Sequence, residues 1–187
     1  MKKALALSLA LALISMQTAC ALRIDGDDWS SRDYDEITDG DYADTEFSWR
    51  QTGCDADAWV WGDSSAAVVV LWIYGFEVEG SGTADITWQF HLNAEFEETG
   101  SGNAYIQFQF DVYKGTTYID SSASWTKDTD YYGYGSCTLE DLGVSTGTYW
   151  VLCSVYVVAS ADDNSSEAEA DAYYGPLQIE TCYVDIV

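Results

Sequence analysis

The stretch GSGTADITWQFHL, residues 80–92, is repeated in pattern by GSGNAYIQFQFDV, residues 100–112. In both copies apolar and polar residues alternate with a period of two, as in a β-strand that has one buried face. Trp88 and Phe90 share one side of the first copy, whereas Gln89 lies on the other. A helix would mix these two sets. The repeat therefore predicts an antiparallel sheet with one dry face and one wet face, on which the remaining strands pack.

Composition limits both the class of protein and its partners. The chain has 187 residues, of which 48% are hydrophobic and 15% aromatic, and this suffices for one core of ordinary size. It carries 32 acidic and 7 basic residues, a formal net charge of −25, which excludes nucleic acid as a partner. The acidity indicates solubility, as in a salty medium, or a cation-binding role; the composition leaves both open.

The first 21 residues have the features of an export signal. Lys2 and Lys3 precede an apolar run, residues 4–15, that is too short to span a bilayer as a helix. Processing after Ala21 and processing at Cys20 are both consistent with the sequence. Residues 17–20 resemble a bacterial lipobox, from which Gln17 departs because an aliphatic residue is usual there, and we favour a lipid on Cys20. We expect an extracytoplasmic protein, secreted or anchored to the outer membrane or cell surface, that meets the membrane only through this lipid.

Four cysteines remain after Cys20, an even number that predicts two disulfides in an exported chain. We expect a hairpin around a turn at residues 141–147, and its midpoint places Cys137 opposite Cys153. Cys54 would then pair with Cys182 and join the first strand region to the last.

Strands are expected along most of the chain after residue 45. Residues 22–45 are rich in Asp without a sustained period and predict an acidic tether or an irregular N-terminal wrap, so the β-domain is expected to span residues 46–187. Alternation of Ala with acidic residues at 167–173 predicts a strand with its alanines inward, although Ala and Glu also favour helix. With a hairpin through Lys114-Gly115, the total is eight or nine antiparallel strands. The expected fold is an all-β, jelly-roll-like sandwich.

Catalytic chemistry has little support in the sequence. His91 is the only histidine, which limits nucleophilic catalysis and argues against a zinc site. Residues 62–65, GDSS, resemble the opening block of GDSL-type hydrolases, but that family's late Asp-x-x-His and α/β fold are missing, so we interpret them as a turn. A jelly-roll glycoside hydrolase with paired carboxylates remains the alternative function.

Two groups of residues are candidate binding sites. Calcium is the ion that the acidic turns would suit, since it prefers carboxylate and carbonyl oxygens, and no other cofactor is expected. The candidate ligands are Asp128, Asp130, Asp162 and Asp163. Aromatic side chains in or beside predicted loops would stack on sugar rings, or else cap the ends of the sandwich: Tyr131, Tyr132, Tyr134, Tyr173 and Tyr174.

The C-terminal third of the chain, where Thr146-Gly-Thr-Tyr149 precedes alternating small and apolar residues, resembles small exported bacterial β-sandwich surface proteins. The resemblance implies a surface or matrix role and supplies no catalytic residue. We therefore expect a structural or binding domain whose partner is a glycan or another surface protein. Its oligomeric state stays open.

Overall fold

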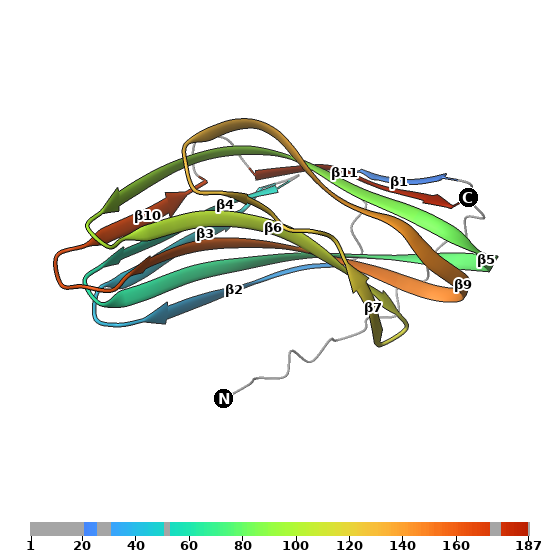
Figure 1. Cartoon of the computed structure of the whole chain (residues 1–187), viewed down its shortest axis with the longest axis horizontal. Coiled ribbons are helices and arrows are strands. Elements are labelled where there is room, and N and C mark those ends of the chain that lie inside the picture. Colours follow the sequence, from blue (N-terminus) through green and yellow to red (C-terminus); the bar gives the residue numbers. More distant parts are fainter. Residues whose placement is uncertain (1–20, 26–30, 51–52, 173–176, 187) are drawn as a thin grey trace.

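The structure is a computed structural model that describes residues 21–25, 31–50, 53–172 and 177–186, with backbone only for the first and last of these segments. The described residues form antiparallel strands arranged in two layers, and they include no helix that could cross a membrane (Figure 1). The predicted all-β sandwich is confirmed. The described strands number eleven: β1 (Ala21–Asp25), β2 (Ser31–Asp39), β3 (Ala43–Trp49), β4 (Gly53–Trp61), β5 (Ser64–Thr99), β6 (Asn103–Lys114), β7 (Thr117–Ser121), β8 (Trp125–Lys127), β9 (Tyr131–Ala161), β10 (Glu167–Asp171) and β11 (Leu177–Ile186).

Two very long strands, β5 and β9, belong to both layers. Figure 1 shows them turning back together at one end of the molecule. Residues 64–78 of β5 pair with residues 147–161 of β9 in one layer, and residues 81–94 pair with residues 131–145 in the other. The register shifts after Val78, close to Gly80, whose φ of 95° is easily reached only without a Cβ. β2, β6, β7 and β8 extend the first layer, and β3, β4, β10, β11 and β1 extend the second.

The two copies of the repeated pattern are both strands, as predicted, but they lie in different layers. After the turn at residues 100–102 the chain crosses the sandwich, so that the second copy faces the first through the core. The rings of Phe90 and Phe108 stack with centroids 3.7 Å apart and planes 7° apart, and Trp88 lies 5.6 Å from Phe108. The repeat therefore builds the two walls of one core instead of two neighbouring strands.

The N-terminal boundary differs from the expected one. Residues 31–45 form β2 and the start of β3, because every residue of β2 pairs with β5 along residues 65–73. Tyr34 stacks on Phe47 at 4.0 Å, and the Arg32 guanidinium lies 4.7 Å from the ring centre of Trp49. Residues 31–45, an acidic segment without hydrophobic periodicity, thus form strands because neighbouring strands pair with them. Two local predictions are confirmed: β6 and β7 form the hairpin at Gly115, and the alanines of β10 are buried.

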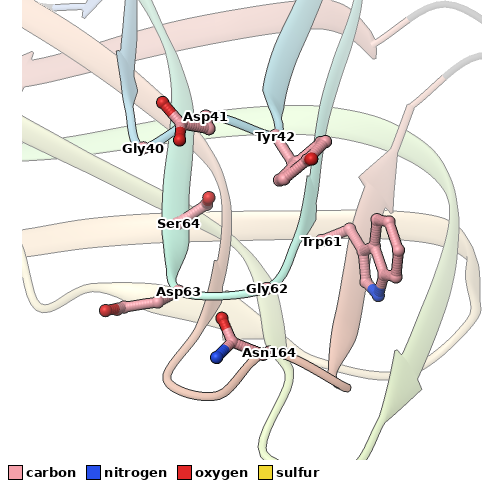
Figure 2. A pocket seen from close by; sticks show the side chains of 8 residues that line it. All are labelled: Gly40, Asp41, Tyr42, Trp61, Gly62, Asp63, Ser64 and Asn164. Atoms are coloured by element: carbon pink, nitrogen blue, oxygen red, sulfur yellow. The ribbon is translucent and has the colours of Figure 1, made fainter.

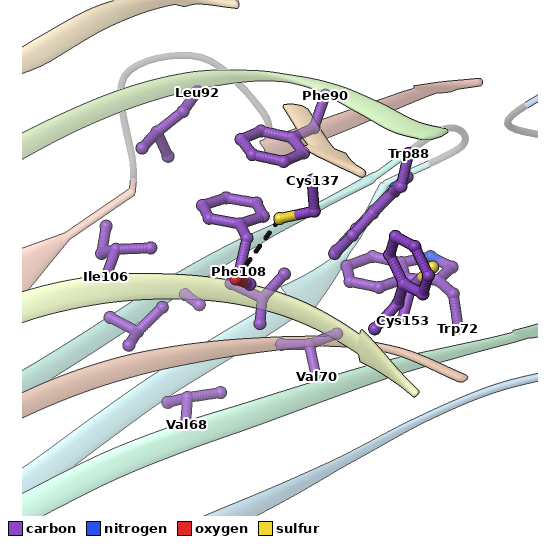
Figure 3. Close-up of a cluster of buried hydrophobic side chains, with 14 of the residues drawn as sticks. Val68, Val70, Trp72, Trp88, Phe90, Leu92, Ile106, Phe108, Cys137 and Cys153 are labelled. Carbon is purple, nitrogen blue, oxygen red and sulfur yellow. Dashed lines mark hydrogen bonds between the residues drawn. The ribbon is translucent and has the colours of Figure 1, made fainter. Parts of the chain in front are cut away.

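The predicted hairpin between Cys137 and Cys153 is wrong. Residues 131–161 are a single strand because β5 runs beside it over nearly its whole length. Cys137 is a free, buried thiol whose Sγ donates to the carbonyl oxygen of Phe108 at 3.4 Å, the contact drawn in Figure 3. Burial raises the pKa of the Cys137 thiol to about 11, which keeps it protonated and inert.

The predicted bridge from Cys54 to Cys182 is also wrong. Cys54 is a free thiol, fully buried, and its pKa is raised by that burial. The strand register places Cys54 opposite Leu177 but Cys182 opposite Trp88. Five residues of strand separate these positions on β11, about 16 Å, whereas a disulfide needs Cα atoms within about 7 Å.

Substitution of Gly135 tests the stack of Phe90 on Phe108. A Cβ at this position would lie 2.4 Å from Cε2 of Phe90 and 3.0 Å from Cε2 of Trp125, and the Phe90 ring is already held by its stack on Phe108. We expect Gly135→Ala to lower the free energy of unfolding by about 1 to 3 kcal/mol, measured by urea denaturation. Gly143→Ala is the control, because nothing lies within 4 Å of that Cβ, and equal losses in both variants would contradict the interpretation.

The thiols are tested by alkylation without reductant. Because Cys54 and Cys137 are buried free thiols, we expect iodoacetamide to leave both unlabelled in the native protein and to label both once denaturant is added. Peptide mapping by mass spectrometry reads the result. A Cys54 or Cys137 peptide that is labelled only after reduction would show that the residue is bridged.

Candidate functional site

Two exposed tyrosines and the single histidine form a ring cluster on the outer face of β5 and β9. Tyr132 is 76% exposed and Tyr134 70% exposed, and as successive outward residues of a strand they lie about 6.6 Å apart. His91 faces Tyr134 across the strand pair. Its ring centre lies 4.9 Å from that of Tyr132 and 5.0 Å from that of Tyr134, with planes 82° and 75° apart. The two tyrosines were expected in or beside a loop but lie in β9, whereas His91 lies in a strand as expected.

Tyr131 points to the other side of β9 and does not join this cluster. Its ring packs on Trp125 at 5.3 Å, and the Lys127 ammonium lies 4.7 Å from its ring centre. The Tyr131 hydroxyl donates to the carbonyl oxygen of Tyr134 at 2.7 Å. Tyr131 therefore fixes the backbone beneath the exposed tyrosines, and only two of the three predicted tyrosines can face a ligand together.

The ring cluster continues into a strip of uncharged polar side chains. Gln89 pairs with Ser136, and Thr87 with Thr138, whose hydroxyl oxygens lie 3.3 Å apart. Register is uninterrupted from Ile86 to Ala94, so these outward positions lie on one continuous strand pair. We call the following eight residues the outer strip: Thr87, Gln89, His91 and Asn93 on β5, and Tyr132, Tyr134, Ser136 and Thr138 on β9.

The outer strip combines ring faces with groups that both donate and accept hydrogen bonds. None of its eight residues is acidic, and carboxylates occupy the next outward positions at its ends: Asp85 and Glu95 on β5 and Glu140 on β9. Tyr, Thr and Ser hydroxyls and Gln and Asn amides can satisfy a ligand's hydroxyl groups in either direction. Chemically, the strip suits a neutral ligand that is rich in hydroxyls and has an apolar ring face.

The four predicted calcium ligands lie on two separate turns. Asp130 accepts a hydrogen bond from the backbone N–H of Phe96 at 3.0 Å. Asp163 accepts from both the N–H and the hydroxyl of Ser165 at 2.9 Å, and these bonds, with those from Ser166 and Ser101, lower the pKa of Asp163 to about 2. Over the described ranges, no three His, Cys, Asp or Glu side chains form a group that could hold a metal ion. The hydrogen bonds of Asp130 and Asp163 are therefore structural: they fix the local backbone.

Three predicted residues cannot be placed. Tyr173, Tyr174 and the lipidation candidate Cys20 lie outside the described residues.

A pocket at one end of the sandwich was not predicted from the sequence. Three turns that are distant along the chain form it: residues 40–42 between β2 and β3, residues 61–64 between β4 and β5, and Asn164 between β9 and β10 (Figure 2). Its volume is about 500 Å³. We call it the end pocket. The only sequence signal was an aromatic residue beside a Gly-Asp pair in each of the first two turns, Gly40-Asp-Tyr42 and Trp61-Gly-Asp63.

Paired carboxylates do occur, on the outer face of the second layer. Asp57 on β4 lies between Glu46 on β3 and Asp171 on β10. Burial raises the pKa of Asp57 to about 7, with smaller contributions from Asp171, Glu169, Glu46 and Asp44. The cavity beside it measures about 100 Å³, below the roughly 300 Å³ at which ligand pockets begin. The geometry therefore does not favour the glycoside hydrolase.

Comparison with known proteins gave structural likenesses only. No protein-family model and no curated protein matches the chain. Similar solved structures include TmCBM61 in complex with beta-1,4-galactotriose (11% identity, TM-score 0.34, 82% of this chain and 88% of that chain). A native family 35 carbohydrate-binding module from Clostridium thermocellum is 9% identical (TM-score 0.37; 90% and 100%), and CBM36 in complex with calcium and xylotriose is 12% identical (TM-score 0.31; 89% and 99%). At these TM-scores the likenesses carry no functional conclusion for this chain.

The raised pKa of Asp57 makes stability depend on pH. A carboxyl whose pKa rises from its usual 3.8 to about 7 on folding favours the folded state below pH 3.8, and this contribution is lost as the pH rises through 7. Because Asp57 is only partly buried, solvent screening reduces the effect. We expect Asp57→Asn to raise the free energy of unfolding at about pH 8 by about 1 to 2 kcal/mol and to have little effect at about pH 4. Urea denaturation across this range is the measurement, with the exposed Glu140→Gln as control; a gain of the same size at both pH values would contradict it.

Proposed function

We propose that this protein is an exported β-sandwich domain that binds uncharged glycans on the outer strip. The observation that carries the proposal is the Tyr132, His91 and Tyr134 ring cluster, which presents two largely exposed tyrosines on a rigid strand pair. Rigid aromatic side chains supply contact area at little conformational cost, so such a surface suits binding more than catalysis. Export is inferred from Lys2, Lys3 and the apolar run that follows them.

Stacking and hydrogen bonding act together in this proposal. The C–H face of a pyranose ring packs on an exposed tyrosine ring, while its hydroxyls exchange hydrogen bonds with the amides and hydroxyls beyond. Four outward positions on each strand cover about 20 Å, enough for several sugar units lying along the strands. The strip presents no fixed negative charge to such a chain.

Charge selects against anionic glycans. The net charge of −25 raises the energy of bringing a uronate or a sulfate to any part of the surface. Neutral oligosaccharides are insensitive to this field. The proposal is therefore restricted to uncharged chains.

The outer strip is tested by tyrosine replacement. We expect the full chain to bind at least one neutral oligosaccharide on a glycan array. Isothermal titration with that oligosaccharide should show a loss of about 5- to 10-fold in affinity for Tyr132→Ala and for Tyr134→Ala, because each removes one ring face. Tyr132→Phe keeps the ring and should retain most of the affinity.

Tyr118→Ala is the matched control, since Tyr118 is 52% exposed but lies on β7. Equal losses for the Tyr118 and Tyr132 variants would contradict the assignment of the strip. Absence of binding to every neutral glycan would overturn the proposed function and leave a structural or protein-binding role.

A further inference from the structure

The end pocket is a preformed cavity, because its turns are tied together. The backbone N–H of Trp61 donates to the carbonyl oxygen of Tyr42, and that of Gly62 to the carbonyl oxygen of Ser166, both at 2.9 Å. Gly40 has a φ of 101°, and a Cβ there would lie 2.3 Å from Oγ of Ser64, so the first turn packs directly on the second. These contacts fix the positions of the lining side chains before any ligand arrives.

Two aromatic rings and two carboxylates share this cavity. Tyr42 is 56% exposed and Trp61 45% exposed, and their ring centres lie 5.3 Å apart with planes 58° apart. Asp41 and Asp63 lie on the same two turns and line the same cavity (Figure 2). The remaining lining residues are neutral: Gly40, Gly62, Ser64 and Asn164.

Elsewhere in the protein, several bases lie over aromatic rings. Arg32 lies 4.7 Å from the ring centre of Trp49, and Lys127 lies 5.1 Å from that of Trp125. The lining of the end pocket contains no Lys or Arg. Its exposed rings and carboxylates thus form an environment for a cation that the lining itself does not supply.

We propose that the end pocket is a second binding site, separate from the outer strip, for a sugar that carries a free amine. Because the carboxylates of Asp41 and Asp63 point apart and away from the Trp61 ring in Figure 2, one sugar unit of a chain would pack on Tyr42 and Trp61 while ammonium groups of its units would lie near Asp41 and Asp63. The inference rests on the proposed function only in taking the ligand to be a glycan. The net charge of −25 adds a long-range attraction for such a cation.

A bare metal ion is a poorer match for these residues. The described side chains include no group of three His, Cys, Asp or Glu that could hold a metal ion, and a metal has no use for two exposed rings. An amino-sugar chain uses both kinds of group, since its ammonium groups pair with carboxylates and its ring faces pack on aromatic rings.

The experiment compares two tetrasaccharides that share one backbone. Oligomers of glucosamine and of N-acetylglucosamine differ in the positive charge, and titration at about pH 6 keeps the free amine protonated. The full chain is used with Tyr132→Ala and Tyr134→Ala combined, which silences the outer strip. We expect this variant to bind the glucosamine oligomer at least about 10-fold more tightly than the acetylated one, with affinity that falls as salt is added.

Two further sets of changes locate the site. Combining Asp41→Asn with Asp63→Asn should cost at least about 10-fold in glucosamine affinity and flatten the salt dependence, since both changes remove charge while keeping shape. Trp61→Ala should cost a similar factor. The matched control, Asp120→Asn with Glu140→Gln, removes two carboxylates elsewhere on the surface and should change affinity by less than about 2-fold.

Each result supports or overturns the inference separately from the proposed function. Three results would overturn the assignment of the end pocket: equal affinity for the two oligomers, equal losses in the pocket and control variants, or no binding by the double tyrosine variant. In each of these cases, neutral glycan binding by the unmodified protein would still support the outer strip. If Trp61→Ala fails to fold, the isosteric Asn variants decide.

Discussion

The stack of Phe90 on Phe108 is the contact on which the rest of the structure depends. Each ring comes from one copy of the repeated pattern, and together they join the two layers at a separation of 3.7 Å. Because side chains alternate along a strand, burying Phe90 necessarily turns His91 outward, next to Tyr134. A slip of one residue would reverse both faces, so the packing of the core also sets the composition of the surface.

Periodicity predicted most of the strands after residue 45 and the face that each buries, but not how strands distant in the sequence pair. The repeat gave two correct faces, yet its copies oppose one another across the core. Residues 141–147 have the composition of a turn, and Asp141 does adopt a positive φ of 56°. Pairing with β5 nevertheless carries β9 through this segment. Pairing with a long partner strand thus overrides the local preference for a turn. Without the turn there is no hairpin, and the expected disulfide does not form.

Of the candidate site, the sequence predicted the part that is close together along the chain, the tyrosines of β9. A run of tyrosines marked Tyr132 and Tyr134, whereas the exclusion of Tyr131 depended on the register with β5. Tyr131 and Tyr132 look equivalent in the sequence; one supports the backbone and the other faces solvent. The end pocket could not be predicted, because its turns come together only through the pairing of β2 with β5 and of β4 with β10. Contacts so distant in sequence leave no local pattern.

The distribution of charge explains why the two surfaces would differ in ligand. Carboxylates are crowded on the outer face of β3, β4 and β10, where burial and repulsion hold Asp57 at a pKa of about 7. The outer strip lies in the same layer with carboxylates only at its ends, so the field at its centre comes from more distant charges and is screened by salt. The end pocket, by contrast, is lined by two carboxylates as well as by two aromatic rings. One negatively charged protein can thus present a surface indifferent to charge and a pocket that selects for it, because at contact range the nearest groups outweigh the net charge.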